Sequence, residues 1–240
     1  MNAEAKIIIT IDGPAGSGKS TLARGLAKAL NGSYISTGAT YRALAVAGIK
    51  HGINPDSSEE AVELLNKLSF RFVSTPDHNL CGHVFINSEE ITEQLEGVGI
   101  GSVASRISQH AEVRSRMVAL QRSIVASAIA DSAKQGVASI VIVEGRDTGT
   151  VVFPTANFKI YLTADLEERA RRQAQKEAEN SQKLERVILE IKERDMRDTT
   201  REVSPLVPAP DAIILDNTSL KPSETLNRAL EIIRERRILC

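Results

Sequence analysis

The sequence predicts an α/β fold, in which a parallel five-stranded sheet is covered by helices and carries a small antiparallel insert and a helical lid. Short β-branched runs alternate with helical patterns along the 240 residues, which is typical of βαβ units. These runs are apolar throughout, as expected for strands covered on both faces. The predicted strands are residues 7–11, 33–36, 139–143, 158–162 and 212–215.

Helical patterns separate the strands. Pro222 stands in the first turn of the last pattern, and Leu226, Leu230 and Ile233 then repeat on one face, as in an amphipathic helix. The predicted helices are residues 20–30, 38–47, 59–68, 110–134, 166–179, 184–195 and 222–236. Together with the strands they predict a single domain spanning residues 1–240.

A glycine-rich segment joins the first predicted strand to the first helix. Residues 13–20 read Gly-Pro-Ala-Gly-Ser-Gly-Lys-Ser, the phosphate-binding pattern of P-loop NTPases in the strand–loop–helix context that it requires. Glycines let backbone N–H groups turn inward around phosphate oxygens, and the helix N-terminus adds its dipole. Lys19 supplies a point charge for the terminal phosphates, and the Ser20 hydroxyl can ligate Mg²⁺. The sequence therefore predicts a nucleoside triphosphate site made by Gly13, Pro14, Ala15, Gly16, Ser17, Gly18, Lys19, Ser20 and Thr21.

Two segments depart from the βαβ rhythm. Within about 68–100, apolar residues alternate at strand-like spacing between turn-forming residues, which predicts a small antiparallel insert. It is either a structural edge hairpin or a flap over a substrate. The region at about 164–202 begins with a helix rich in Arg and Glu whose apolar stripe is thin. Such a helix is either a solvated surface helix or a lid that closes on ligand.

Composition excludes several classes of protein. The 30 Lys and Arg residues balance the 31 Asp and Glu residues, so no overall attraction to a nucleic-acid polymer is expected. Cys81 and Cys240 have neither disulfide nor metal-ligand spacing, which suits a reducing cytoplasm. No apolar run approaches ~20 residues, so no membrane attachment is expected. We expect a cytoplasmic protein that acts as a monomer.

Arginines follow two predicted strand ends. Arg42 closes the motif Thr-Gly-Ala-Thr-Tyr-Arg, which begins at Thr37, and Arg146 and Asp147 follow the third strand. Open α/β sheets bind ligands at this edge. Arg194, Asp198 and Arg201 are spaced to share a helix face if the helix from residue 184 continues. Each arginine alone is typical of a surface ion pair, whereas several held together can bring two phosphates into line.

These stretches together resemble the bacterial cytidylate kinases, which are nucleoside monophosphate kinases. The resemblance covers nearly the whole chain through residues 11–21, 37–42, 144–154, 191–195, 205–212 and 216–218. It implies transfer of the γ-phosphoryl group of ATP, with Mg²⁺, to CMP or dCMP. It also implies that the insert at 68–100 lies beside the monophosphate site and that 164–202 is the lid over ATP.

The resemblance implies a role for each candidate residue. Ser105, Arg114 and Asp147 would face cytosine, whose N4 amino group donates and whose O2 and N3 accept. Arg194 and Asp198 would hold the ribose, and Arg42, Arg146 and Arg201 would clamp the acceptor phosphate beside Thr37. Lys19, Arg146, Arg201 and Arg169 would be catalytic, Arg169 and Arg172 would bind ATP from the lid, and Ser20 would hold the metal ion.

The chain departs from the family pattern at two positions. Ser36 stands where the family usually has Asp, and Glu144 stands where it usually has Asp. Both positions lie near phosphate or metal in a P-loop fold. Neither Glu144 nor Asp12 is assigned as a direct Mg²⁺ ligand.

Three alternatives are weighed against this interpretation. A kinase for AMP, UMP or a hydroxylated metabolite such as shikimate would share the P-loop and differ in the acceptor. A regulatory GTPase would need an Asn-Lys-x-Asp motif, whereas Asn66-Lys67 continues as Leu68-Ser69. Nucleic-acid binding through residues 169–201 is disfavoured because glutamates interleave with the basic residues there.

Overall fold

The computed structural model of the chain describes residues 6–75, 79–97, 99–134, 139–176 and 184–238. Its centre is a five-stranded sheet in the order β2-β6-β1-β7-β8. The strands are β1 (Lys6–Asp12), β2 (Ser33–Ser36), β6 (Ser139–Gly145), β7 (Phe158–Thr163) and β8 (Ile213–Asp216), and every neighbouring pair is parallel. The predicted parallel five-stranded sheet is therefore confirmed.

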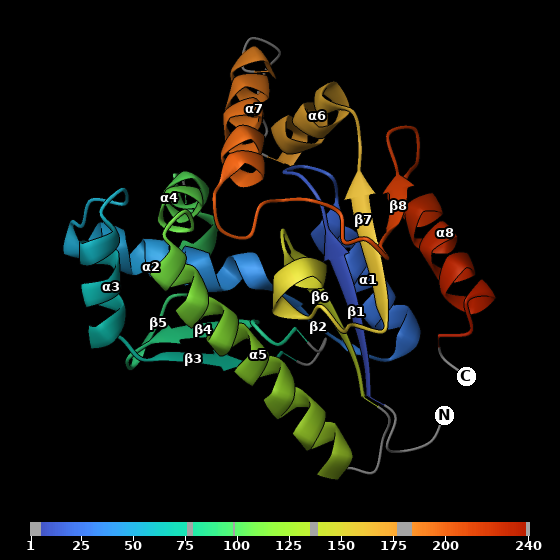
Figure 1. The fold of residues 1–240 in the computed structure, drawn as a ribbon, viewed down its shortest axis with the longest axis horizontal. Coiled ribbons are helices and arrows are strands. Elements are labelled where there is room, and N and C mark those ends of the chain that lie inside the picture. The colour runs from blue at the N-terminus through green and yellow to red at the C-terminus, as the bar shows by residue number, and fades with distance from the viewer. Residues whose placement is uncertain (1–5, 76–78, 98, 135–138, 177–183, 239–240) are drawn as a thin grey trace.

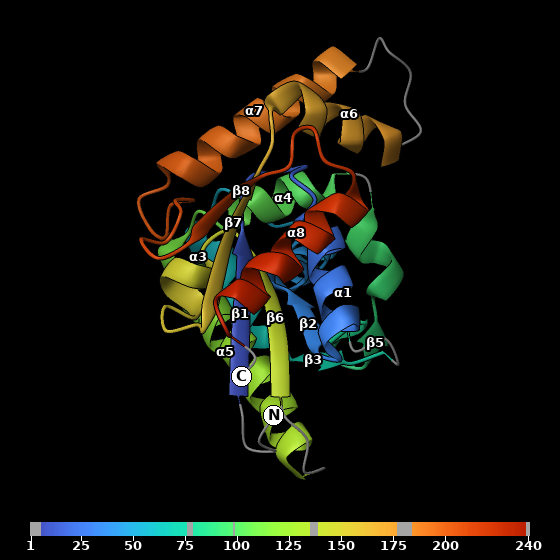
Figure 2. The same ribbon diagram turned by 90° about the vertical axis from the view of Figure 1, so that its right-hand side faces the viewer.

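Helices cover both faces of the sheet (Figure 1). On one face lie α1 (Lys19–Leu30) and α8 (Pro222–Glu235), which Figure 2 shows side by side. On the other lie α2 (Thr37–His51), α3 (Ser58–Lys67) and α5 (Ala111–Lys134). β6 explains this division, because Ile140 and Ile142 pack in the core with α1 and α8 while Val141 and Val143 pack in the core with α2 and α5. Because a buried core covers each face of the sheet, the strands are apolar on both faces.

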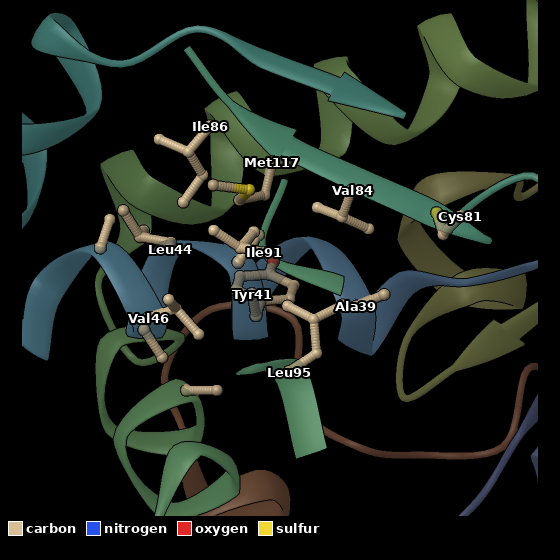
Figure 3. Close-up of a cluster of buried hydrophobic side chains, with 14 of the residues drawn as sticks. Ala39, Tyr41, Leu44, Val46, Cys81, Val84, Ile86, Ile91, Leu95 and Met117 are labelled. Carbon is tan, nitrogen blue, oxygen red and sulfur yellow. The ribbon is translucent and has the colours of Figure 1, made fainter. Parts of the chain in front are cut away.

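The predicted insert is a three-stranded antiparallel sheet of β3 (Phe70–Val73), β4 (His83–Ile86) and β5 (Glu89–Glu90). It packs under α2, and Figure 3 shows Val84 and Ile86 of β4 in one buried cluster with side chains of α2. A 3₁₀ turn, η1 (Thr92–Glu96), follows and adds Leu95 to this cluster. The insert is thus attached to the helix that opens at the end of β2. The turn residues 76–78 and residue 98 lie outside the described part of the chain.

One helix that the pattern did not predict is α4 (Ile100–Ile107). It begins after Gly99, whose φ of 80° marks a left-handed residue, and its first turn contains a second glycine. Local start signals are therefore weak, and burial of Ile100, Ala104 and Ile107 against the α2 cluster stabilises the helix instead. A π-helical turn, η2 (Thr148–Val152), was also not predicted.

Two helices, α6 (Leu166–Lys176) and α7 (Leu184–Thr200), lie beyond the carboxyl ends of the central strands (Figures 1 and 2). They share a small core, in which Ala170, Ala174, Val187 and Ile191 pack together with Ala15 of the glycine-rich loop. The predicted helix at 166–179 is described to Lys176, and its last residues lie outside the described part. α7 runs five residues further than predicted, so Arg194 and Asp198 share one helix.

Candidate active site

The glycine-rich loop leaves β1 and returns as α1. A Cβ on Gly13, whose φ is +152°, would lie 2.0 Å from the carbonyl oxygen of Leu162, so the loop can cross β7 only without a side chain there. A Cβ on Gly16, whose φ is +75°, would lie 2.8 Å from the carbonyl oxygen of Arg169 in α6. Glycine at position 13 therefore lets the loop cross β7, and glycine at position 16 lets α6 pack against the loop.

Lys19 is the first residue of α1, and its side chain is folded back over the loop. Its Nζ donates to the carbonyl oxygen of Pro14 at 2.7 Å and approaches Ser17 Oγ at 3.4 Å. Burial lowers the pKa of Lys19 well below its ordinary value, and the nearby Arg146 lowers it further, against an opposing effect of Glu144. The ammonium group is thus held where a negative charge would stabilise it.

The register of the sheet brings three strand ends together. Ser36 of β2 lies opposite Glu144 of β6, and Gly145 of β6 lies opposite Asp12 of β1. Ser20 Oγ donates to Glu144 Oε1 at 3.0 Å, and Thr37 Oγ1 donates to the Glu144 carbonyl oxygen at 3.0 Å. Two oxygen atoms that suit Mg²⁺, the Ser20 hydroxyl and the Glu144 carboxylate, therefore lie in contact beside Lys19.

The carboxylate of Asp12 accepts hydrogen bonds from the segment that follows β6. Its two oxygens accept from the backbone N–H of Thr148 at 2.8 Å, the Thr148 hydroxyl at 2.8 Å and the backbone N–H of Gly149 at 2.7 Å. Burial raises the pKa of Asp12, although these hydrogen bonds oppose the shift. Because all three bonds hold the start of η2, Asp12 fixes the position of Arg146 and Asp147.

A cavity of about 210 Å³ opens between the glycine-rich loop, α2, α4, the end of β6 and α7. Among the residues that the structure describes, its lining carries six basic side chains and three carboxylates, so its charge is positive. The basic residues are Lys19, Arg42, Arg114, Arg146, Arg194 and Arg201, and the acidic ones are Glu144, Asp147 and Asp198. Arginines predicted from scattered stretches of sequence thus converge on one cavity opposite the loop.

One end of the cavity holds a buried ion pair. Arg114 Nη2 donates to Asp147 Oδ2 at 2.5 Å, and its Nη1 donates to the carbonyl oxygen of Ser108 at 3.1 Å. Ser105 lies nearby on α4, where its hydroxyl accepts from Arg197 Nε at 3.3 Å. Guanidinium donors, a carboxylate and a hydroxyl therefore meet among buried side chains of this cavity, as recognition of a ring with both donor and acceptor edges requires.

The second ion pair joins β6 to α7. Arg146 Nε donates to Asp198 Oδ2 at 2.8 Å. Burial alone would raise the pKa of Asp198, but Arg146 and Arg194 outweigh burial and hold it below its ordinary value. Burial and the neighbouring Arg146 lower the pKa of Arg194 to about 10. The cations here exceed the carboxylates that neutralise them, so a bound anion would stabilise the cluster.

Several donors at this cavity are buried without a hydrogen-bond partner. In the described part of the chain they include the Nε atoms of Arg42, Arg114 and Arg194, Nη2 of Arg201 and the hydroxyl of Tyr41. Each of these residues lines the cavity. A buried donor that lacks an acceptor costs about 1–3 kcal/mol, so the arrangement favours a ligand rich in acceptors, such as a phosphate ester.

A second cavity, of about 300 Å³, adjoins the loop on its other side. Gly16, Gly18 and Thr21 line it together with Arg172 and Asn217. Arg172 Nη1 donates to Asn217 Oδ1 at 3.0 Å, and Asn217 Nδ2 donates to the carbonyl oxygen of Ser17 at 3.1 Å. The loop therefore separates two cavities, one cationic and one mostly uncharged.

Helices α6 and α7 are attached directly to the glycine-rich loop. Arg169 Nη1 donates to the carbonyl oxygen of Ala15 at 3.0 Å and to Asp195 Oδ2 at 2.5 Å. Asp195 Oδ1 accepts from the backbone N–H of Ala15 at 3.2 Å. Arg169 is buried in these contacts and is not among the residues that line either cavity.

Most of the predicted site residues line the first cavity. These are Ala15, Gly16, Gly18, Lys19, Ser20, Thr21, Thr37, Arg42, Ser105, Arg114, Arg146, Asp147, Arg194, Asp198 and Arg201. Arg172 lines the second cavity, and Gly13, Pro14, Ser17 and Arg169 line neither. Tyr41, Asp195 and Asn217 were not singled out, although all three lie in the blocks that carry the family resemblance.

Two further findings concern membrane spans and clusters of metal-binding side chains. Within the part of the chain that it describes, no helix combines the length and apolar character needed to cross a bilayer. Among the same residues, no three His, Cys, Asp or Glu side chains gather as a metal site would require.

Comparison with known proteins agrees with this geometry. The family model for cytidylate kinase matches residues 9–235. A cytidylate kinase of Thermotoga sp. (strain RQ2) is 42% identical over 231 residues, which cover 95% of this chain and 97% of that protein. Cytidylate kinases of Thermotoga maritima and Salmonella paratyphi B are 41% and 40% identical over the same share of this chain, and 97% and 96% of those proteins are covered. The chain therefore belongs to the cytidylate kinase family.

Proposed function

We propose that this protein transfers the γ-phosphoryl group of ATP to CMP, giving ADP and CDP, in pyrimidine nucleotide metabolism. The observation that carries the proposal is the convergence of five arginines and Lys19 on one cavity beside the glycine-rich loop. A protein that only binds a nucleoside triphosphate needs no such cluster beside the loop. A kinase does need it, because the donor and acceptor phosphates repel each other and several cations must hold them together.

The donor nucleotide would bind across the loop. Its phosphates would contact the backbone N–H groups of residues 13–21, and its base and ribose would occupy the second cavity beside Arg172 and Asn217. Lys19 would exchange the carbonyl oxygen of Pro14 for a phosphate oxygen, since its ammonium group is buried next to other cations. It would then follow the charge as the phosphoryl group moves.

The acceptor nucleotide would lie in the first cavity. The Arg114–Asp147 pair and Ser105 present both donors and acceptors to the cytosine edge. Arg194 and Asp198 would hold the ribose, while Arg42, Arg146 and Arg201 would hold the phosphate beside Thr37. The acceptor oxygen is already anionic, so the reaction needs positioning and charge neutralisation and no general base.

The residues around Ser20 fit a magnesium ion. The Ser20 hydroxyl would be its protein ligand, and Glu144 would hold that hydroxyl or a metal-bound water in place. An ion held there would supply positive charge to neutralise the charge that develops on the phosphates. Ser20→Ala should therefore raise the Mg²⁺ concentration required for half-maximal rate, and isothermal titration of Mg²⁺ into the complex with a non-hydrolysable ATP analogue should give a weaker binding constant.

The lid and the insert have separate roles in this proposal. The region 164–202 would close over ATP and exclude water, which otherwise competes as acceptor. The insert at 68–100 would support the acceptor site through α2, with which it shares a buried cluster. We further propose that the protein is a monomer, which sedimentation equilibrium would test, and that dCMP serves as a second acceptor.

An acceptor panel tests the function. ADP release is measured with CMP, dCMP, UMP, AMP and shikimate at equal concentrations, and the product is identified by ion-exchange chromatography. We expect CMP and dCMP to be phosphorylated fastest. A preference for AMP would remove the assignment of the base pocket, and nucleotide binding without phosphoryl transfer to any acceptor would indicate a switch protein.

A further inference from the structure

Tyr41 lies in the second turn of α2, next to Arg42, and lines the first cavity. Its ring is packed into the apolar cluster that α2 shares with the insert, where Figure 3 shows it beside Ile91 and Ala39. The hydroxyl at the end of this ring is buried and has no hydrogen-bond partner. The side chain is thus a rigid apolar body that carries one unsatisfied polar atom.

The groups around this hydroxyl belong to the acceptor site. The guanidinium of Arg114 lies 5.6 Å from the ring centroid. Arg114, Asp147 and Arg201 are also the charged groups that act on the phenol. Arg201 Nη2 is likewise buried without a hydrogen-bond partner, and it forms an ion pair with Asp147 Oδ1 at 4.0 Å. Two donors that make no hydrogen bond therefore line the same cavity and act on each other electrostatically.

A structural role would not place a hydroxyl there. Phenylalanine would fill the same apolar cluster and would leave no buried polar atom, so tyrosine costs stability at this position unless a ligand supplies an acceptor. Asp147, the carboxylate that acts on this hydroxyl, is already paired with Arg114. Burial raises the pKa of Tyr41 to about 12, so the hydroxyl keeps its proton at neutral pH and can donate it.

We propose that the Tyr41 hydroxyl binds the phosphate of the acceptor nucleotide, donating to an oxygen that it shares with Arg201. This inference rests on the proposed function, since it assumes a nucleoside monophosphate in the first cavity. It adds a residue that contacts substrate through a neutral donor. Arginines alone surround a phosphate with charge, whereas a hydroxyl on a packed ring fixes the position of one oxygen.

Tyr41→Phe tests the proposal, because it removes only the hydroxyl. Hydrogen bonds to a charged group are worth about 1.5–3 kcal/mol, which corresponds to roughly a tenfold to hundredfold change in affinity. We expect the KM and the dissociation constant for CMP to rise at least about tenfold. The inhibition constant of cytidine, which has no phosphate, should stay within about twofold of the wild-type value.

Thermal unfolding separates this role from a structural one. The unliganded variant should unfold at the same temperature as the wild type or at a higher one, and the stabilisation by CMP should shrink. Tyr161→Phe is the matched control, since Tyr161 in β7 is partly buried and does not line either cavity. This control should leave the KM for CMP unchanged.

Three results would overturn the proposal. The first is an unchanged dissociation constant for CMP. The second is an equal loss of affinity for cytidine and CMP, which would place the hydroxyl at the base or ribose. The third is a lower unfolding temperature of the unliganded variant. Failure of the proposed function itself has a different signature. In that case the wild-type protein would not phosphorylate CMP at all, whatever the variant does.

Discussion

Asp195 and Arg169 form an ion pair between α7 and α6, with Asp195 Oδ2 2.5 Å from Arg169 Nη1. Both side chains also bond to the backbone of Ala15, one to its N–H and the other to its carbonyl oxygen. The two helices are thereby held to the glycine-rich loop by residues 154 and 180 positions away in the sequence.

Asp195→Asn should loosen this attachment and let water reach the phosphoryl group. We expect the turnover for CDP to fall about tenfold and the ratio of ADP to CDP formed to rise above one, because a poorly closed lid no longer excludes the competing acceptor. Both products are quantified in one reaction. Glu190→Gln, on an exposed face of the same helix, is the control, and equal ratios in the two variants would contradict the role of Asp195.

Lys19→Ala should lower turnover by two orders of magnitude or more, since one preorganised donor at a developing charge is worth about 10²–10³ in rate. The fold should persist, because burial already disfavours the ammonium group, as its lowered pKa indicates. Circular dichroism and a coupled ADP-release assay measure the two effects. Near-normal CDP formation would reject the assigned role.

Arg194→Met should stabilise the unliganded protein while weakening CMP binding. The pKa of Arg194 is lowered to about 10 by burial and by repulsion from Arg146, so both its charge and its burial oppose folding. We expect the free energy of unfolding to rise by roughly 1 kcal/mol and the KM for CMP to rise at least about tenfold. Urea unfolding with and without CMP measures the stability and the binding of CMP, and the coupled ADP-release assay measures the KM. A less stable unliganded variant would contradict the expected stabilisation.

Asp12→Asn should disturb the acceptor site from outside the cavity. An amide replaces one of the two oxygens that accept three hydrogen bonds from Thr148 and Gly149, and one donor then faces another. We expect a loss of about 2 kcal/mol in unfolding free energy and a higher KM for CMP. Asp131→Asn, an exposed change on α5, should have neither effect.

Acid should destabilise the protein in part through Asp198. Its folded-state pKa lies below the ordinary value of 3.8, so the unfolded chain takes up the proton first as pH falls. Its contribution is therefore complete above about pH 4.8 and is lost as pH falls through 3.8 toward the folded-state pKa. Asp198→Asn should be less stable at pH 7 by roughly 3 kcal/mol.

The same substitution should show a flatter dependence of stability on pH. Urea unfolding between pH 3 and pH 7 compares the slopes of the two proteins. Parallel curves would mean that Asp198 titrates alike in the folded and unfolded states.

The sequence predicted the elements that local pattern determines. The five strands, the glycine-rich loop and the insert each have a periodicity or a motif of their own. The structure confirms the strands and the antiparallel insert, and it places the loop between β1 and α1. The convergence of Arg42 and Arg146 followed from strand ends, because parallel strands end at one edge of a sheet. What each of these residues binds remains a prediction.

Other features depend on packing between distant segments and had no local signal. Helix α4 is stabilised by its buried face rather than by its glycine-containing first turn. Asp195 bonds to Ala15 only because α6 and α7 pack against the glycine-rich loop. The sequence pattern around Tyr41 is typical of the buried face of a helix, and only the folded structure shows that its hydroxyl lacks a hydrogen-bond partner.

The strand order β2-β6-β1-β7-β8 puts the loop-bearing strand β1 at the centre of the sheet. The segments after β2 and β6 line the first cavity, and α7, which follows β7, adds Arg194 and Asp198 to it. Among the residues that the structure describes, those of 37–134 line the first cavity and not the second, so changes in this segment would alter the acceptor side while the donor side keeps its lining. A hybrid protein that takes residues 37–134 from a kinase of different preference should keep its affinity for ATP while its choice of phosphate acceptor changes.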